Sequence, residues 1–322
     1  MRAGRLSPST TAPRSATIAG SRPAASFRFS SCGASLANAA QTVVMRVAAA
    51  ALALAFAGCL SLPAGEHVVH SERSAYQTLI VTDTPTRRCL RFDDVNSALN
   101  QSCQQLTEPD QLVFDYTRAM TALLLLWQPP PQRVLLIGVG GGSIPRAVAR
   151  TRPQVELDAV DIDEAVIQVA QRYFGLTPQP QLRLHVADGR EFVAATRSRG
   201  QHYDAVLLDA FDAHGIPPAL FSEEFLRDIH TVLTPDGVFL ANTLAGSVSY
   251  AQETRTATAV FGRIYSVQLA VSGGNRLIVA ARDPARLPTV EHLLSGLPEQ
   301  APALARIGID AAWVDRMKFM SN

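Results

Sequence analysis

Aspartates follow three apolar runs in the middle of the chain. Asp161 ends the run VELDAVD, Asp188 follows LRLHVA, and Asp209 and Asp212 end YDAVLLDAFD. Short apolar runs predict buried strands, and the carboxyl ends of parallel strands meet at one edge of a sheet, where such sheets bind ligands. Carboxylates at that edge can accept hydrogen bonds from ribose hydroxyls or from cationic amines. These side chains therefore predict a ligand site at one edge of a parallel sheet.

A glycine-rich turn precedes the first of these aspartates. Residues 133–142, RVLLIGVGGG, read as a buried strand that runs into a turn with Gly138, Gly140 and Gly142, and Asp161 lies 23 residues after Gly138. Glycines adopt backbone angles closed to other residues and let a ligand approach the main chain. The pattern predicts a nucleotide-binding βαβ unit with Asp161 on the ribose. The alternative is that the glycines only turn the chain and the aspartates only cap helices. This alternative could hold for any one of these residues, but it is less favoured for all of them together.

Composition indicates one large α/β domain with a smaller appendage. The chain has 322 residues, 47% of them hydrophobic and 18% charged, with a net charge of +1. Residues 1–44 hold five arginines and no acid, which leaves 24 basic against 28 acidic side chains in the remainder. A mildly acidic folded part disfavours nucleic acid as a partner.

The first 65 residues do not predict a fold. A basic start at Met45 and Arg46, an apolar run over 47–57 and the small-residue exit before Cys59 are typical of a secretory signal. The sequence before Cys59, Phe-Ala-Gly, also resembles a lipoprotein cleavage box, so membrane attachment through lipidated Cys59 competes with ordinary cleavage near Gly65. We therefore expect a bacterial envelope location, with the cytoplasm as the alternative.

Two of the four cysteines, Cys89 and Cys103, lie outside this leader. The segment 87–106 alternates and then reverses around Asn96, midway between them. If the segment is a hairpin, the two thiols face each other and can form a disulfide. Two unlinked, half-buried thiols are the alternative in a reducing compartment.

The order of predicted elements indicates a specific α/β layout. Short strands over 66–110 are typical of a small antiparallel β-domain. A helix is predicted over 111–127, and repeated strand–helix units over 111–283 end in an antiparallel hairpin. This is the layout of a methyltransferase-type Rossmann fold. Residues 284–322 read as one or two peripheral helices.

The stretch from about 74 to 243 resembles the spermidine synthase (polyamine aminopropyltransferase) family. The resemblance rests on Tyr76-Gln77, on Tyr116 in the helix before the glycine turn, and on the motifs IGVGGGS, VDIDEAVI, VADGREF and DAFD followed by SEEFLRDI. It implies a transferase of polyamine biosynthesis that moves an aminopropyl group from decarboxylated S-adenosylmethionine to an amine. The sequence has no paired His/Cys or HExxH arrangement, so no metal is expected. The acceptor is a small amine or polyamine, and a homodimer is compatible with this prediction.

The resemblance also assigns donor-binding residues. Asp161 is expected on the ribose and Asp188 on the adenine amino group. Gln77 is expected to contact the donor, and the glycines of IGVGGGS and VADGREF are expected to lie beside it. The expected donor-binding set is Gln77, Gly138, Gly140, Gly142, Asp161, Asp188 and Gly189.

The expected catalytic residues are Asp209, Asp212 and Tyr116. In the family, the acid that matches Asp209 takes the proton of the attacking amine, Asp212 helps to hold the diamine, and Tyr116 lies between the two substrates. The residue types suit the reaction, because an amine of pKa near 10.4 must lose its proton and a positioned carboxylate can accept it.

Two positions depart from the family pattern. Active relatives carry an acid at the position of Gly141, where it binds the aminopropyl nitrogen, and another at the position of Arg118. Losing one such charge-assisted hydrogen bond costs roughly 1.5–3 kcal/mol, and an arginine in the pocket would repel a polyamine.

These departures keep two alternatives open. One is a methyltransferase that uses S-adenosylmethionine, with Gly141 making room for the donor carboxylate and Arg118 pairing with it. The other is a non-catalytic envelope protein that binds adenosyl compounds or polyamines.

Overall fold

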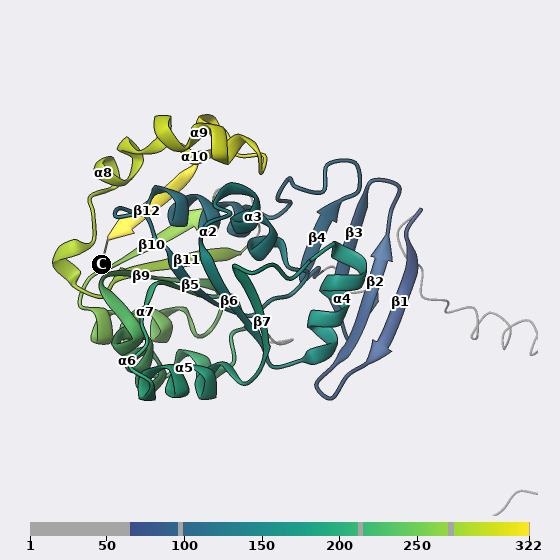
Figure 1. The fold of residues 1–322 in the computed structure, drawn as a ribbon, viewed down its shortest axis with the longest axis horizontal. Coiled ribbons are helices and arrows are strands. Elements are labelled where there is room, and N and C mark those ends of the chain that lie inside the picture. Colours follow the sequence, from purple (N-terminus) through teal and green to yellow (C-terminus); the bar gives the residue numbers. More distant parts are fainter. Residues whose placement is uncertain (1–64, 96–98, 212–214, 270–273, 322) are drawn as a thin grey trace, which may run out of the picture. The chain divides into compact units, whose positions relative to one another are not determined.

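The computed structural model describes residues 65–95, 99–211, 215–269 and 274–321. Two sheets organise these residues (Figure 1). Within the described residues, no helix combines the length and the apolar character needed to cross a membrane.

The smaller sheet is antiparallel, in the order β1-β2-β3-β4. Its strands are β1 (His67–Arg73), β2 (Thr78–Asp83), β3 (Arg87–Phe92) and β4 (Ser102–Gln105). The first of these strands was not predicted, because HVVHSER alternates weakly and lies at the sheet edge with most of its residues at least partly exposed. Cys89 lies opposite Cys103 across β3 and β4, and the two form a disulfide, which confirms the predicted hairpin.

One face of the small sheet packs on a helix that follows a strand of the larger sheet. Leu79, Val81 and Leu90 lie in one buried cluster with Val166 and with other residues of α4 (Glu164–Phe174). Figure 1 shows α4 beside β2 and β3. The small sheet is therefore held next to the carboxyl end of β6, where α4 begins.

The larger sheet has the order β12-β10-β11-β9-β8-β5-β6-β7. Its parallel strands are β5 (Arg133–Ile137), β6 (Glu156–Asp161), β7 (Leu182–Val186), β8 (Tyr203–Leu208) and β9 (Leu233–Leu244). Three antiparallel strands complete it: β10 (Ile264–Leu269), β11 (Asn275–Ala281) and β12 (Met317–Ser321). The strand order reverses between β5 and β8, and open α/β sheets bind ligands at such a point.

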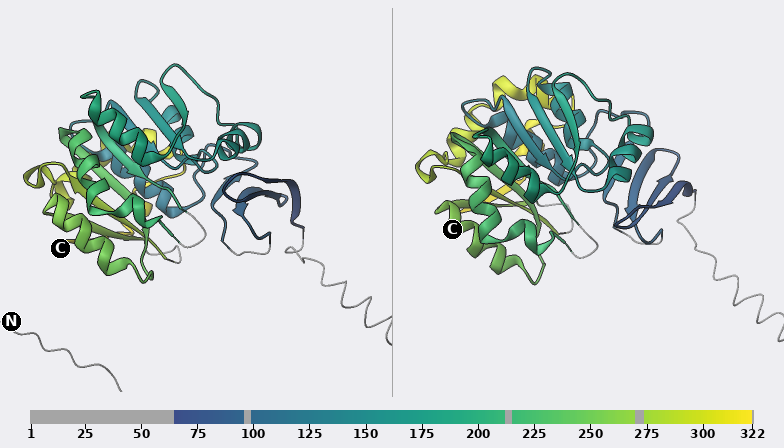
Figure 2. Two further views of the ribbon diagram at one scale, coloured as in Figure 1. Left: turned by 90° about the horizontal axis from the view of Figure 1, so that it is seen from below. Right: turned by 60° about the horizontal axis from the view of Figure 1, so that its bottom comes forward.

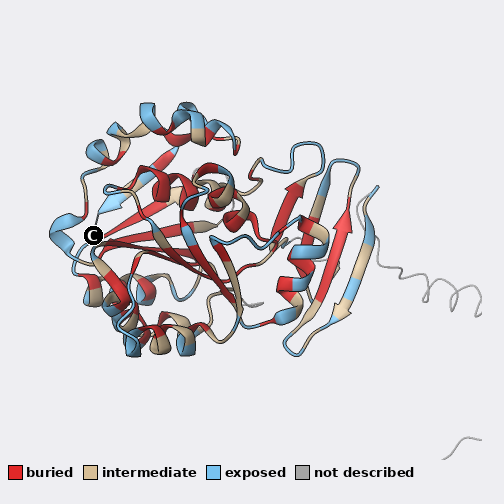
Figure 3. Cartoon of the chain, viewed as in Figure 1, coloured by how far each residue is buried: buried red, intermediate tan, exposed pale blue. Residues whose placement is uncertain are grey.

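Alternation along the strands divides the core between the two faces of the sheet. In β5, Val134 and Leu136 belong to one buried cluster, and Leu135 and Ile137 to the other. The first cluster includes α2 (Asp115–Leu126) and α3 (Ser143–Thr151); the second includes α5 (Gly189–Ser198), α6 (Glu223–Val232) and α7 (Tyr250–Phe261). Figures 2 and 3 show helices on both faces and buried strands between them. The predicted methyltransferase-type α/β fold is confirmed.

The C-terminal segment differs from the prediction of peripheral helices alone. It contains α8 (Val290–Ser295), α9 (Leu297–Ala305) and α10 (Ala311–Val314), but it ends in β12, which pairs with β10. Leu304 and Trp313 are buried in the core, so the segment covers one face of the sheet. A five-residue edge strand leaves little periodicity to detect, and its pairing is set by a partner strand about fifty residues earlier in the chain. The short 3-10 helices are η1 (Pro218–Phe221) and η2 (Pro284–Arg286).

The helix predicted over 111–127 is shorter in the structure. It begins at Asp115, and Phe114 occupies the capping position with extended backbone angles. Tyr116 is therefore in the first turn of α2, at the end that faces the cavity described below.

Candidate active site

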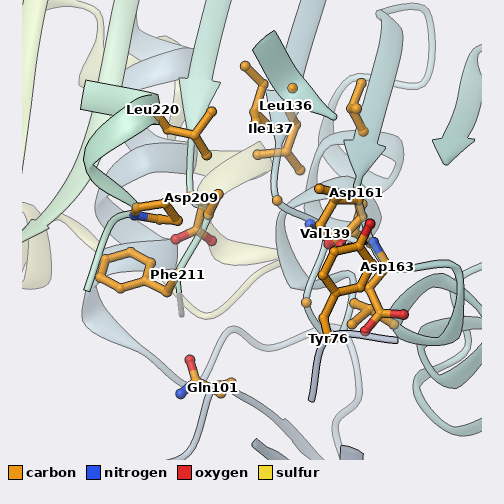
Figure 4. Close-up of a pocket in the computed structure, with 18 of the residues that line it drawn as sticks. Tyr76, Gln101, Leu136, Ile137, Val139, Asp161, Asp163, Asp209, Phe211 and Leu220 are labelled. Carbon is orange, nitrogen blue, oxygen red and sulfur yellow. Dashed lines mark hydrogen bonds between the residues drawn. The ribbon is translucent and has the colours of Figure 1, made fainter. Parts of the chain in front are cut away.

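A cavity of about 310 Å³ lies at the carboxyl ends of the parallel strands. The ends of β5, β6 and β8 form its floor, and residues next to β2 and β4 of the small sheet close it. Figure 4 shows Asp209 and Phe211 on one side, with Asp161, Val139 and Tyr76 on the other. The predicted sheet edge is thus a cavity with walls from both sheets.

The glycine turn forms the centre of the floor. Gly138 has φ +95°, and a Cβ there would lie 2.3 Å from the carbonyl oxygen of Asp209, so only glycine fits. Gly140 has φ +52° and lines the cavity. Gly142 does not line it; with φ +71° it caps α3 and lies against Leu176. Of the three glycines expected at the donor, two therefore reach the cavity.

Gly141 is small for a different reason. A Cβ at this position would lie 2.5 Å from Oγ and 2.9 Å from Cβ of Ser102 in β4. The Ser102 hydroxyl is also 3.2 Å from the hydroxyl of Ser143 at the start of α3. Ser102 thus occupies the space in which a side chain at 141 would begin. The acid expected at this position in active relatives is absent from the sequence, and a side chain here would require Ser102 to move.

Asp161 binds the turn from the end of β6. Its Oδ2 accepts a hydrogen bond of 2.8 Å from the backbone N–H of Val139, and its Oδ1 accepts one of 3.0 Å from that of Asp163. Burial raises the pKa of this carboxyl, while these backbone donors oppose the rise. The backbone N–H of Gly140 is a third donor to this carboxylate. The three donors do not fill its four lone-pair positions, so the side chain can still accept a bond from a ligand.

Asp188 both caps a helix and lines the cavity. Its carboxylate accepts a 2.7 Å bond from the backbone N–H of Arg190, and Gly189 begins α5. A Cβ on Gly189 would lie 2.7 Å from Cγ2 of Ile137, so the helix approaches β5 closely because this residue is glycine. The capping alternative is therefore correct for Asp188, but it does not exclude a ligand contact.

The small sheet contributes Gln77, which was expected at the donor, and Tyr76, which was not, to the cavity lining. Their loop is fixed to the larger sheet by Ser74, whose hydroxyl donates a 2.5 Å bond to Oδ2 of Asp163. Asp163 is buried and also caps α4 through the backbone N–H of Ala165. This contact joins the two walls of the site across 89 residues of sequence.

Asp209 follows β8 and carries the most unusual electrostatics of the cavity. Its Oδ1 accepts a 2.9 Å bond from the side-chain amide of Asn242 in β9, and the phenol of Tyr116 donates to the same carboxylate. Burial raises the pKa of Asp209 to about 7, although both hydrogen bonds act against the rise. Burial also raises the pKa of Tyr116 well above 10, so the phenol stays a donor. A carboxyl that titrates near neutrality can accept a proton during a reaction.

Arg118 is not in the cavity, which corrects the expectation that it repels a polyamine or binds a donor carboxylate. Its Nε donates a 2.8 Å bond to the carbonyl of Leu112, and its guanidinium lies 3.3 Å from the carboxylate of Asp115. Residues 116 and 118 do not share a face of α2. Tyr116 and Thr117 line the cavity, and Arg118 does not.

Asp212 lies outside the described residues, so the structure does not place it.

Two residues that contribute to the site were not predicted, Asn242 and Ser102. Asn242 is a polar residue near the end of the apolar strand VFLANT, which is a detectable signal; Ser102 has none beyond its place beside Cys103. No group of three or more histidine, cysteine or acidic side chains that could hold a metal occurs among the described residues.

The strand order and the glycine turn after β5 define the class of the protein as a methyltransferase-like Rossmann fold. The family model described as spermine/spermidine synthase domain matches residues 113–271. A polyamine aminopropyltransferase of Vibrio vulnificus is 37% identical over 239 residues, which cover 74% of this chain and 78% of the relative. The chain belongs to the spermine/spermidine synthase family, and the predicted resemblance is confirmed.

Solved structures agree with this assignment. Human methyltransferase-like protein 13 in complex with SAH is 28% identical, with a TM-score of 0.56, and covers 63% of this chain and 98% of its own. A spermidine synthase in complex with the transition-state analogue AdoDATO is 20% identical, with a TM-score of 0.60, and covers 77% and 87% of the two chains. The second likeness supports the fold alone. Both neighbours were solved with a ligand of the S-adenosylmethionine type.

Proposed function

We propose that this protein transfers an aminopropyl group from decarboxylated S-adenosylmethionine to an amine. The observation that carries the proposal is Asp209, a carboxylate with a pKa of about 7 beside the glycine turn. The family to which the chain belongs supports it, because its relatives are named polyamine aminopropyltransferases.

The charges of the cavity favour a donor without a carboxylate. Among the described residues that line it, four are acids: Asp161, Asp163, Asp188 and Asp209. Arg190 is the one base among them; it is exposed and lies 3.4 Å from Glu224. An acidic cavity attracts a donor that carries a sulfonium and an ammonium group, and it disfavours the added carboxylate of S-adenosylmethionine.

The proposed reaction is one displacement at carbon. The amine nitrogen attacks the methylene carbon next to the sulfonium sulfur, a C–N bond forms, and the C–S bond breaks with its electron pair going to sulfur. Methylthioadenosine leaves, and the proton of the new ammonium goes to Asp209. Holding the two substrates together can supply a large part of the ~7–11 kcal/mol available from orientation.

A second candidate is methyl transfer from S-adenosylmethionine. Residue 141 is glycine and Ser102 occupies the space beside it, so the turn carries no carboxylate to bind an aminopropyl nitrogen. The likeness to a human methyltransferase structure with SAH favours the same candidate. The third alternative, binding without turnover, has no observation of its own in its favour.

Ligand-dependent melting and product mass separate these functions. Stabilisation by methylthioadenosine, with an amine that gains an aminopropyl group in the presence of the decarboxylated donor, supports the proposal. Stabilisation by S-adenosylmethionine with gain of a methyl group supports the second candidate and contradicts the first. Stabilisation by a polyamine alone, with neither product, would establish a binding protein.

We also propose that residues 45–59 direct the protein to the bacterial envelope, by ordinary cleavage or by lipidation of Cys59. The basic start, short apolar run and small-residue exit support this proposal. The disulfide between Cys89 and Cys103 supports it too, because disulfides persist in oxidising compartments. The segment itself lies outside the described residues.

A further inference from the structure

Two asparagines connect the hairpin β10–β11 to Asp209. The side-chain amide of Asn275, the first residue of β11, donates a 3.0 Å bond to Oδ1 of Asn242. The amide of Asn242 then donates the 2.9 Å bond to Oδ1 of Asp209. Asn242 is 1% exposed, whereas Asn275 is partly exposed.

The outer bond supports the orientation in which the inner amide donates to Asp209. An asparagine carries a donor and an acceptor at nearly equal positions, so Asn242 could fit its site in two orientations. In the other orientation, its oxygen would face the carboxylate oxygen of Asp209, and two acceptors would be in contact. In the structure the NH₂ group of Asn275 faces the oxygen of Asn242, which satisfies that oxygen and keeps the NH₂ group of Asn242 toward Asp209.

Asp209 therefore has donors on two elements, Asn242 from β9 and Tyr116 from α2. Tyr116 is the titratable side chain that contacts Asp209 among the described residues, and its raised pKa keeps it neutral. The two donors fix the plane of the carboxylate. They leave its other lone pairs for the cavity, where the amine must be deprotonated.

We propose that Asn275 is a positioning residue, which acts through Asn242 to hold the Asp209 carboxylate in the orientation that accepts the amine proton. The inference rests on the proposed function, because it assigns the base role to Asp209. It extends that function to a residue of the hairpin, one hydrogen bond beyond the catalytic carboxylate.

Asn275→Ala tests the inference without touching Asp209. The variant loses the bond that orients Asn242, so the ionised form of Asp209 loses support and the acidic limb of the pH–rate profile moves to higher pH. We expect kcat/KM near pH 6 to fall by about tenfold, which corresponds to one pH unit, with a smaller change above about pH 9. Affinity for methylthioadenosine should stay within about twofold. Asn275→Gln keeps a donor amide and should recover part of the loss.

The matched control is Gln268→Ala, on the neighbouring strand β10, whose side chain is likewise partly exposed. It should leave the profile unchanged. A folded Asn275→Ala protein with the wild-type melting temperature and the wild-type pH profile would overturn the inference.

A titration that needs no substrate separates this inference from the proposed function. The carboxyl ¹³C resonance of Asp209, assigned by its loss in Asp209→Asn, should titrate at higher pH in Asn275→Ala than in wild type. An unchanged titration rejects the role of Asn275 even if the enzyme proves to be an aminopropyltransferase. A shifted titration in a protein whose Asp209→Asn variant keeps full activity rejects the base role of Asp209 and leaves the hydrogen-bond chain intact.

Discussion

Ser102 fills the space that a side chain on Gly141 would need, with its Oγ 2.5 Å from the position of such a Cβ. The two residues belong to different sheets, since Ser102 lies in β4 and Gly141 in the turn after β5. Gly141 does not have a positive φ, so its backbone conformation does not require glycine. The contact with Ser102 is the reason that a larger residue does not fit here.

Gly141→Asp alone should therefore lower the stability of the folded protein. The new Cβ collides with Ser102, and overpacking of this kind costs about 1–3 kcal/mol of folding free energy. Pairing it with Ser102→Gly removes the collision and should restore stability. The double variant also places an acid by the donor, so affinity for the decarboxylated donor should rise relative to S-adenosylmethionine. Thermal melting and calorimetric binding check both parts; equal stability of Gly141→Asp and wild type would contradict the packing argument.

Asp209→Asn should abolish turnover and leave methylthioadenosine binding largely intact. The amide keeps the size of the carboxyl but cannot accept the amine proton. In the wild type, the rate should rise as the pH increases through about 7, because Asp209 must be ionised to act as the base. Initial rates across pH, together with calorimetric affinity, give the measurement. Activity near the wild-type level in the variant would remove Asp209 from the mechanism.

The same substitution should change stability in a pH-dependent manner. The pKa of Asp209 is about 7 in the folded protein, above the value near 3.9 of an unfolded chain. The folded state therefore holds this proton more tightly. Its stabilising effect is fully present below about pH 4 and is lost progressively as the pH rises through about 7. Asp209→Asn should melt at a higher temperature than wild type near pH 8, and the difference should narrow as the pH falls and vanish below about pH 4. A difference that does not vary with pH would contradict the assigned cause.

Local sequence patterns were enough to predict the sheet edge and most of its carboxylates. The apolar strands before Asp161, Asp188 and Asp209 are regular and continuous, so their ends could be located along the chain. The glycine turn was equally local, and two of its three predicted glycines line the cavity.

Contacts between distant segments could not be predicted in the same way. The Asn242–Asp209 bond joins residues 33 positions apart, and the Ser74–Asp163 bond joins residues 89 apart. The position of Arg118 was predicted wrongly. Its alignment with a family position was taken to mean that its side chain points into the cavity. On α2 it bonds to Leu112 and Asp115, away from the cavity.

Asp161→Ala should weaken nucleoside binding by roughly 1.5–3 kcal/mol, through loss of charge-assisted bonds to the ribose. Because Asp161 also holds the N–H groups of Val139 and Asp163, part of the loss will come from a looser turn. Calorimetry with methylthioadenosine and with S-adenosylmethionine measures the change, and Glu164→Gln, an exposed neighbour at the start of α4, is the control. Unchanged affinity for both ligands would refute an adenosyl site.

Replacing both disulfide cysteines by serine should destabilise the small sheet. The bond between Cys89 and Cys103 closes a loop with a sequence separation of 14, and a loop of that size contributes about 3 kcal/mol in the chain-entropy model. Ser102 is adjacent to Cys103, so donor affinity should also fall. Melting of wild type with and without a reductant should show the same loss, while a reductant should not affect the double variant.

The disulfide also tests the proposed compartment. If Met45 begins a working export signal, protein isolated from its native host should start at or shortly after Cys59 and carry the Cys89–Cys103 bond. Mass spectrometry after alkylation, performed before and after reduction, reports the mature terminus and the two thiols in one experiment. Recombinant protein reduced and then alkylated gives the reference mass for free thiols. An intact leader together with two free thiols would contradict export, and the protein would then act where sulfonium donors are made, in the cytoplasm.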